Sequence, residues 1–324
     1  MIIDLYIFFT VVSASSINFF ISDINNKYHP VAWLGKIIKY FIPKLKHNNN
    51  QNERINGIFF SIIFVIFIGI SIHILTIYFY IINIFFFLIF SILILNITIS
   101  IKGMEKHVDE IINSLYENDL KKARTKLSMI VSRDTSKLDK QHILSSTIES
   151  IGDSIVDGIT SPLFYFSLFG PAGAVVFRLV STLDSMIGYK NEYFVNIGWM
   201  SAKLDSFLNF IPARITSLIM VLASLVSMSD WKNSIKIFKK DRKKPESYNS
   251  GYPMSILAGA LRIKLEKTDY YTIGVSYEPL SELKCKQAIK LMKITTILFI
   301  IIVSIPTIFI LSLFQWWEFL FAIK

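Results

Sequence analysis

The chain has 324 residues, of which 52% are hydrophobic and only 18% are charged, and its formal net charge is +10. This composition is too apolar for an ordinary soluble protein and predicts an integral membrane protein. The positive charge does not indicate nucleic acid binding, because the lysines flank apolar segments and no basic stripe is interleaved with aromatic residues. The single cysteine, Cys285, excludes an internal disulfide and a thiolate cluster for zinc.

The N-terminal segment, residues 1–130, is predicted to hold membrane helices with cytoplasmic loops. Residues 2–21 are apolar and lack both a basic start and a small-residue cleavage site, so we expect a retained membrane helix rather than a signal peptide. A lysine-rich loop is expected over residues 22–54, with an interfacial turn at its His29-Pro30 step. Residues 55–101 contain no Asp, Glu, Lys or Arg.

That uncharged stretch would extend about 70 Å as a single helix, which is twice the thickness of a hydrocarbon core. It therefore predicts a hairpin of two spanning helices, with a turn near residues 73–80. The polar residues 102–144 follow and are rich in lysine, which places them in the cytoplasm by the positive-inside rule. Their periodicity over residues 105–130 predicts two amphipathic helices with a turn at Glu117-Asn118-Asp119.

Residues 131–214 carry many charged side chains among apolar neighbours. A charge in such surroundings costs several kcal/mol unless it is paired, metal-bound or hydrated, so the pattern indicates a polar site. Residues 147–159 are expected to be helical, which puts Glu149, Asp153 and Asp157 on one face. That face is either a solvated acidic surface or a cluster that holds Mg²⁺ or a cationic substrate group, and the apolar neighbours favour the cluster.

The stretch over residues 161–180 contains prolines and glycines, which predict a broken, re-entrant or interfacial segment. Charged and amide side chains of both signs follow it: Asp184, Lys190, Glu192, Asp205, Asn209 and Arg214. Each alone is typical of an ordinary interfacial residue. Together they are typical of a phosphate-handling site, because Arg and Lys bind oxyanions and carboxylates bind a metal.

The C-terminal part carries fewer signals. Residues 215–228 are too short to span alone and are expected to continue a buried helix from Asp205. The basic residues 231–244 are expected to rest on anionic headgroups. Residues 246–259 predict a loop entering a helix that closes over the site. Residues 294–314 predict a spanning helix, with Trp316 and Trp317 as its interface belt.

Several motifs of this chain stand in the order and spacing of one known family. They are Ser132-Arg133-Asp134-Thr135-Ser136, Asp157-Gly158 followed by Pro162-Leu163-Phe164-Tyr165, Thr182 to Lys190, Ile211-Pro212-Ala213-Arg214, His29-Pro30-Val31 with Trp33 and Gly35, and Asn249, Gly251 with Ala258-Gly259-Ala260-Leu261. Over roughly residues 20–265 the chain resembles the CobD/CbiB family, which contains the cobinamide-phosphate synthases of adenosylcobalamin biosynthesis.

The resemblance implies an integral membrane enzyme that joins aminopropanol, or its O-phosphate, to the free propionate of adenosylcobyric acid with ATP and Mg²⁺. On this basis Asp134, Asp157, Asp184 and Lys190 are expected to be catalytic, and Glu149, Asp153 and Asp157 to bind the metal. Substrate or phosphate binding is expected of Ser132, Arg133, Thr135, Glu192, Asp205, Asn209, Arg214, His29 and Asn249. No Walker A loop occurs, so the nucleotide would bind by another scheme.

Four positions depart from the family pattern: Ala32, Ser154, Ser181 and Ser206 stand where Arg, Asn, Asn and Asp are usual. Asp153 itself replaces the usual Glu of a Glu-Asn pair. These departures would affect the amine substrate or the activity more than the family assignment.

The sequence thus predicts an all-α, polytopic membrane protein of about four to six transmembrane helices with a polar site facing the cytoplasm. Its three segments are 1–130 with membrane helices, 131–265 with the active site, and 266–324 with a linker and the last membrane helix. Expected partners are the substrates, the lipid bilayer, and a second copy or other corrin-pathway membrane enzymes. A non-enzymatic membrane sensor of AmpE-like type is the alternative; a transporter is disfavoured because no inverted repeat is found.

Overall fold

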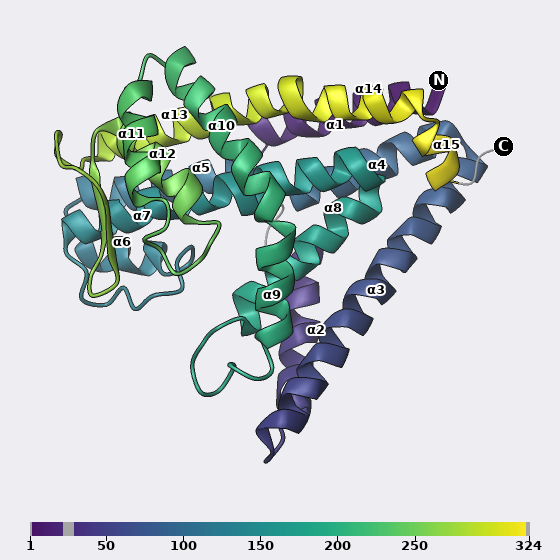
Figure 1. Ribbon diagram of the computed structural model, residues 1–324, viewed down its shortest axis with the longest axis horizontal. Helices are drawn as coiled ribbons and strands as arrows, with labels where there is room; N and C mark the ends of the chain where they lie inside the picture. The colour runs from purple at the N-terminus through teal and green to yellow at the C-terminus, as the bar shows by residue number, and fades with distance from the viewer. Residues whose placement is uncertain (1, 22–28, 322–324) are drawn as a thin grey trace. The chain divides into compact units, whose positions relative to one another are not determined.

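The computed structural model describes residues 2–21 and 29–321. Contacts divide the chain into two compact units that alternate along the sequence (Figure 1). Unit 1 comprises Met1–Ser100, Ser161–Asn209 and Ile300–Lys324, and unit 2 comprises Ile101–Thr160 and Phe210–Phe299. The three segments expected from the sequence follow composition along the chain, whereas these units follow contacts, so their boundaries differ.

Unit 1 is entirely helical over its described residues. Its elements are α1 (Ile2–Phe20), α2 (Pro30–Leu45), α3 (Asn50–Ile82), α4 (Ile84–Thr98), α8 (Ser161–Ile187), α9 (Trp199–Leu208), the π-helix η2 (Ile300–Ser304), α14 (Ile305–Leu313) and α15 (Trp316–Leu320). The expected hairpin of apolar helices is confirmed as α3 and α4, which pack against each other. Its turn is at Asn83, beyond the predicted residues 73–80, because the Asn83 side chain accepts from the Phe85 backbone N–H and caps α4.

The loop expected over residues 22–54 is wrong for its described part. Pro30 occupies the first turn of α2, where its fixed φ suits a helix and its missing N–H is no loss. His29 is the N-cap, and its Nδ1 accepts from the Val31 backbone N–H at 3.3 Å. The interfacial turn predicted at this step is therefore a helix start. The remaining residues of the expected loop, 22–28, lie outside the described part.

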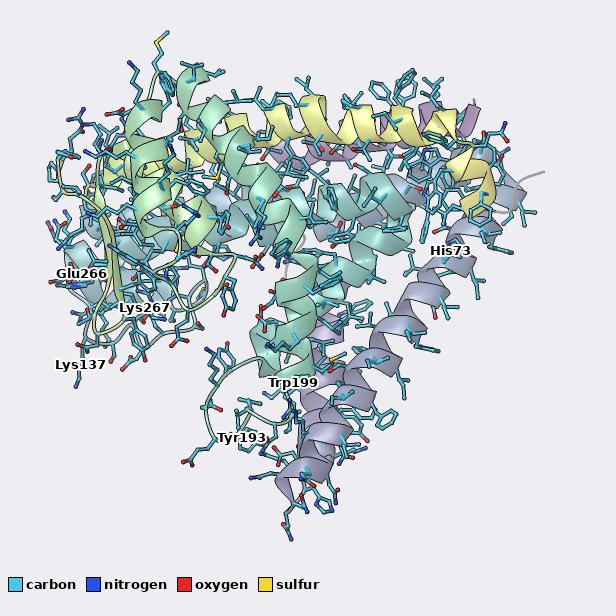
Figure 2. All side chains as sticks on the ribbon, viewed as in Figure 1. His73, Lys137, Tyr193, Trp199, Glu266 and Lys267 are labelled. Carbon is cyan, nitrogen blue, oxygen red and sulfur yellow. The ribbon has the colours of Figure 1, made fainter. Side chains whose placement is uncertain are left out.

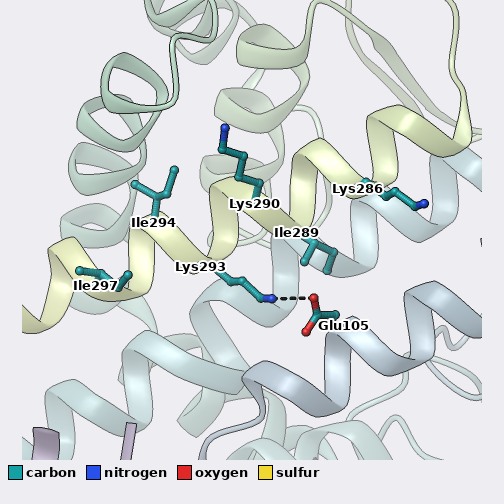
Figure 3. A pocket seen from close by; sticks show the side chains of 7 residues that line it. All are labelled: Glu105, Lys286, Ile289, Lys290, Lys293, Ile294 and Ile297. Carbon is teal, nitrogen blue, oxygen red and sulfur yellow. Dashed lines mark hydrogen bonds and ion pairs between the residues drawn. The ribbon is translucent and has the colours of Figure 1, made fainter. Parts of the chain in front are cut away.

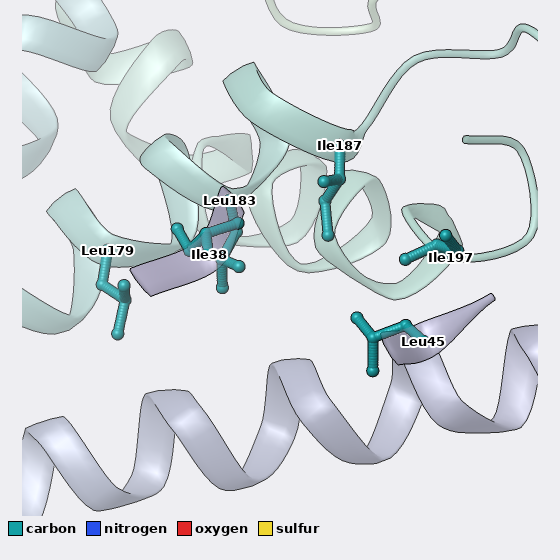
Figure 4. Close-up of a cluster of buried hydrophobic side chains, with 6 residues drawn as sticks. All are labelled: Ile38, Leu45, Leu179, Leu183, Ile187 and Ile197. Atoms are coloured by element: carbon teal, nitrogen blue, oxygen red, sulfur yellow. The ribbon is translucent and has the colours of Figure 1, made fainter. Parts of the chain in front are cut away.

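The core of unit 1 explains why α2 forms. Its apolar residues recur at helical spacing, so that Ile38 and Leu45 share a buried face. They pack with Leu179, Leu183 and Ile187 of α8 and with Ile197 (Figure 4). On α3, Gly57 has no side chain and so permits the carbonyl of Ile197 to approach closely.

The break predicted within residues 161–180 is confirmed. Gly170, inside α8, has φ 64° and ψ −152°, a combination available essentially to glycine, and Pro171 follows it. The helix nevertheless resumes and runs to Ile187, so residues 181–187 are helical. The interface-belt role of Trp317 is wrong, because its side chain is fully buried and stacks on Phe321.

Unit 2 contains the small sheet of the described chain. Its elements are α5 (Ile101–Tyr116), α6 (Leu120–Leu127), α7 (Lys140–Ile155), the π-helix η1 (Val156–Thr160), α10 (Phe210–Val226), α11 (Trp231–Asp241), α12 (Gly251–Leu261), β1 (Lys264–Lys267), β2 (Tyr271–Gly274) and α13 (Glu282–Phe299). The two predicted amphipathic helices are confirmed as α5 and α6. The turn between them is where expected, with Asn118 at φ 55° and the Asp119 side chain capping α6.

The strands β1 and β2 form an antiparallel hairpin that the sequence analysis did not predict. Their register pairs Lys264 with Gly274 and Lys267 with Tyr271. The hairpin is joined to unit 2 at both ends. The Glu266 backbone N–H donates to Ser145 of α7 at 2.8 Å, and the Gly274 N–H donates to the buried carboxylate of Asp241 at 2.8 Å.

Five described helices are long and apolar enough to cross a membrane, or six if α9 and α10 together form one broken span. The five are Ile3–Phe20, Asn50–Ile82, Ile84–Tyr116, Lys140–Ile187 and Glu282–Leu313. Most of α3 is not covered by protein, and large apolar residues such as Ile63, Phe67 and Ile70 are more than half exposed. Because water would penalise such a surface, the fold is that of an all-α polytopic membrane protein.

Candidate functional site

The centre of the candidate site is Glu149, a buried carboxylate on α7. It is only 1% exposed, and burial of an isolated charge would be strongly unfavourable. Three side chains satisfy it. Arg133 Nη2 donates to Oε2 at 2.5 Å, Tyr271 Oη donates to Oε2 at 2.9 Å, and Ser145 Oγ donates to Oε1 at 2.8 Å. Glu149 is therefore the centre of a polar cluster, and protein groups satisfy the hydrogen bonds of its carboxylate.

The hairpin supplies Tyr271 and fixes its position. In Figure 2 the neighbouring Glu266 and Lys267 mark where the strands lie in unit 2. Burial first, and then the negative charge of Glu149, raise the pKa of the Tyr271 phenol. The hydroxyl therefore stays protonated and acts as a hydrogen-bond donor to the carboxylate.

Asp153 lies one helical turn beyond Glu149 and is only partly buried. Ser250 donates a hydrogen bond to its carboxylate, and the charges of Glu149, Arg133 and Lys267 are near enough to act on it. Asp153 thus combines partial access with cationic neighbours, which distinguishes it from the fully enclosed Glu149. It is the more accessible of the two carboxylates.

Arg214 of α10 binds the residue that precedes Ser250. Its Nη1 donates to the side-chain oxygen of Asn249 at 3.3 Å. Its guanidinium also lies over the rings of Phe210 and Tyr252, with centroid distances of 3.4 and 4.6 Å. The rings hold the cation in a defined orientation, as expected of an anion-binding arginine.

Two other predicted residues of unit 2, Thr135 and Asp134, are hydrogen-bonded to groups outside this cluster. Thr135 is buried and donates to the Arg124 backbone oxygen at 3.0 Å. Ser132 and Asp134 are exposed. The Ser136 backbone N–H donates to Asp134 at 2.8 Å and, with the Ser136 side chain, lowers the pKa of Asp134. Asp157 lies in the π-helical turn η1, so the regular spacing that would align it with Asp153 ends before it.

The remaining predicted residues belong to unit 1. Asp205 and Asn209 are one turn apart as expected, and Asn209 Nδ2 donates to both carboxylate oxygens of Asp205 at 3.2 Å. Asn209 is itself buried and accepts from Ser161 Oγ at 2.7 Å. Asp184 is partly buried near the end of α8. Lys190 and Glu192 are exposed in the loop that follows, and His29 caps α2 as described above.

Within residues 2–21 and 29–321, no group of three or more His, Cys, Asp or Glu side chains is arranged to hold a metal ion. Glu149, Asp153 and Asp157 therefore do not form a three-carboxylate cage. Mg²⁺ is commonly held by one or two carboxylates together with substrate phosphates and water, and Asp153 fits that simpler arrangement. The metal role of the three carboxylates stays a prediction.

Sequence reasoning missed four residues of the cluster: Ser145, Ser250, Lys267 and Tyr271. Ser145 and Ser250 are small polar residues without a charge to draw notice. Lys267 and Tyr271 lie on the unpredicted hairpin, far from α7 in sequence. The alternation in Lys264-Leu265-Glu266-Lys267, in which Leu265 is buried, was the available signal for that strand.

Comparison with known proteins gives a consistent answer. The family model described as "CobD/Cbib protein" matches residues 11–312. A "Probable cobalamin biosynthesis protein CobD" of Methanothermobacter thermautotrophicus is 37% identical over 85% of this chain and 89% of its own length. Proteins named "Cobalamin biosynthesis protein CobD" from Clostridium perfringens and Leptospira interrogans are 38% and 40% identical, over 78% and 75% of this chain and 80% and 77% of their own. No solved structure matches the chain.

The fold and the polar cluster define a class: a multi-helical membrane protein with a buried, hydrogen-bonded polar cluster in one of its two units. Within that class, the family match over nearly the whole chain is decisive. The chain belongs to the CobD/CbiB family of cobalamin biosynthesis proteins.

Proposed function

We propose that the chain is an ATP-dependent amide ligase of cobalamin biosynthesis. It joins aminopropanol, or aminopropanol O-phosphate, to the free propionate of adenosylcobyric acid and gives adenosylcobinamide or its phosphate. The C–N bond forms as one carboxylate oxygen leaves with a phosphate derived from ATP, and the amine loses a proton. The observation that carries the proposal is the family match over residues 11–312, which includes every residue of the cluster around Glu149.

In this proposal Asp153 binds Mg²⁺ or the amine. The side chain of Asp153 is partly exposed, and the cations Arg133 and Lys267 act on it, which supports that role. A carboxylate beside cations could hold a metal ion while the cations contact the phosphates of a bound nucleotide. Mg²⁺, when bound, would neutralise charge that develops on the transferred phosphate. Glu149 acts through Arg133: it orients the guanidinium, which also donates to Ser146 at 3.1 Å.

Arg214 is proposed to bind an oxyanion, either of the nucleotide or of the substrate carboxylate. Its fixed position over two aromatic rings reduces the conformational entropy that it loses on binding. Asp134, Asp157, Asp184 and Lys190 remain proposed catalytic residues. Ser132, Thr135, Glu192, Asp205, Asn209, His29 and Asn249 remain proposed substrate contacts.

We further propose that the protein is a multi-pass protein of the cell membrane with its site facing the cytoplasm. One observation supports this orientation: the polar segments are rich in lysine. The proposed use of ATP, which is a cytoplasmic substrate, agrees with it. A second copy of the chain, or another corrin-pathway membrane enzyme, is a proposed partner.

The experiment is an amide-formation assay with the purified, detergent-solubilised full chain. Adenosylcobyric acid, Mg-ATP and either amine are supplied, and the corrin product and ADP are measured by mass spectrometry. Asp153→Asn is compared with Glu117→Gln, which removes one negative charge from an exposed position on unit 2. We expect Asp153→Asn to lower the rate about a hundredfold or more and Glu117→Gln to leave it unchanged.

The outcomes separate the function from the site. Product formation by the original chain with full activity of Asp153→Asn would retain the ligase and refute the role of Asp153. Absence of product with both amines, from protein that elutes as a folded species, would refute the ligase and favour a sensor. The departures at Ala32, Ser154, Ser181 and Ser206 would then be the first positions to restore to the family residues.

A further inference from the structure

A groove of about 290 Å³ lies on unit 2, and none of its lining residues is assigned to the reaction (Figure 3). It is lined by α13 and by Glu105 of α5. Lys286, Lys290 and Lys293 of α13 recur at intervals of four and three residues, so they share one face of the helix. Figure 3 shows this face, with Lys290 directed to one side of α13 and Lys293 directed to the other side, toward Glu105.

The charges of the groove do not balance. Lys293 pairs with Glu105 at 2.5 Å, but Glu105 is also paired with Lys102 at 2.7 Å. The other carboxylate that acts on this region is Asp109 of α5. Four lysines against two carboxylates leave an excess of two positive charges, and like charges at these spacings repel. The groove is therefore complementary to an anion.

The position of the lysines along α13 identifies the kind of anion. Lys293 is the last charged residue before the apolar run that completes the candidate span Glu282–Leu313. The groove also includes Ile294 and Ile297, and Ile297 is 46% exposed. A molecule that fits must thus place negative charge beside the lysines and hydrocarbon beside the isoleucines. In a bilayer this is the boundary at which lipid phosphates lie.

We propose that this groove binds one anionic phospholipid, with its headgroup phosphate held by Lys286, Lys290 and Lys293 and an acyl chain along Ile294 and Ile297. Lys290 is central to the proposal, since its side chain is exposed in the groove and has no ion-pair partner among the described residues. Bound lipid would relieve the repulsion among the three lysines. It would also fix the depth of α13 relative to the membrane surface.

The test uses the full chain in nanodiscs and native mass spectrometry after partial delipidation. Phosphatidylglycerol is compared with phosphatidylcholine, and soluble glycerol phosphate tests whether the phosphate alone suffices. The triple variant K286Q/K290Q/K293Q is matched with K121Q/K122Q/K137Q, which removes the same charge from exposed positions of unit 2 outside the groove. K290Q alone serves as a second variant that breaks no ion pair between described residues, and K290R as the conservative one.

We expect one phosphatidylglycerol to be retained, and its affinity to fall about fivefold for each groove lysine removed, while K290R and the K121Q/K122Q/K137Q variant keep it. Equal loss in the two triple variants would show that overall surface charge, and not the groove, holds the lipid. Retention of phosphatidylcholine equal to phosphatidylglycerol, or unchanged binding by K290Q, would also overturn the proposal. Binding of glycerol phosphate with the same affinity would assign the groove to a soluble phosphate instead.

Discussion

Replacement of Tyr271 by Phe tests whether the hairpin holds the acidic centre of the site. The change removes one hydroxyl, which donates to Glu149 at 2.9 Å, and leaves the ring in place. A hydrogen bond to a charged group contributes about 1.5–3 kcal/mol, and water cannot replace this one because Glu149 is 1% exposed. Glu149 keeps Arg133 and Ser145, so we expect a cost of about 2 kcal/mol.

The assay is hydrogen exchange of the hairpin, followed by mass spectrometry in detergent. If strands β1 and β2 open locally, a cost of about 2 kcal/mol accelerates exchange of their amides roughly thirtyfold. The matched control is Tyr270→Phe, since Tyr270 is adjacent but 64% exposed and keeps its ring contact with Lys267. Unchanged exchange in Tyr271→Phe, or equal acceleration in the control, would refute the role of the Tyr271 hydroxyl in holding the hairpin to Glu149.

Three further predictions concern stability. Gly170→Ala should lower the free energy of unfolding by about 1–3 kcal/mol, because residue 170 has a positive φ, and should lower Tm by at least about 2 °C. In the control Gly158→Ala, the added Cβ would meet Ser154 at an ordinary 3.8 Å, so Tm should change little. Asp241→Ala should speed exchange at the Gly274 end of the hairpin, since the partly buried Gly274 N–H loses its acceptor, at a cost of about 1–3 kcal/mol. An unaltered exchange rate of the Gly274 amide would contradict this. Because the pKa of Tyr271 is raised in the fold, the contribution of its hydroxyl to the free energy of unfolding should be intact below pH about 10 and decline above it. The Tm difference between the original chain and Tyr271→Phe should therefore shrink as the pH rises above about 10.

The membrane helices were predictable because length and charge-free composition suffice to identify them. The apolar stretch over residues 55–101 indicated two helices, and α3 and α4 confirm them. The turn was misplaced because it depends on one capping side chain, Asn83, within a sequence that is otherwise uniformly apolar. The helix α2 was missed for the opposite reason: its lysines suggested a loop, although Ile38 and Leu45 share a buried face.

The candidate site was predictable only in part, and the reason is again physical. Sequence spacing along one helix relates Glu149 to Asp153, because both lie within α7. It cannot reveal that Tyr271, 122 residues further on, donates to the first, or that Ser250 donates to the second. Such partners are set by tertiary packing, and a buried carboxylate requires them wherever in the chain they occur.

The different burial of the two carboxylates gives them different uses. Glu149 has its three donors in the protein, so a ligand would have to break a satisfied network to reach it, and its removal would leave Arg133 with an uncompensated charge. Asp153 is bonded less completely and remains partly accessible. If a metal or an amine binds unit 2, Asp153 is therefore the group to meet it, and Glu149 the group that holds the surrounding cations in place. A substitution at Glu149 should accordingly reduce both stability and activity, whereas one at Asp153 should reduce activity alone.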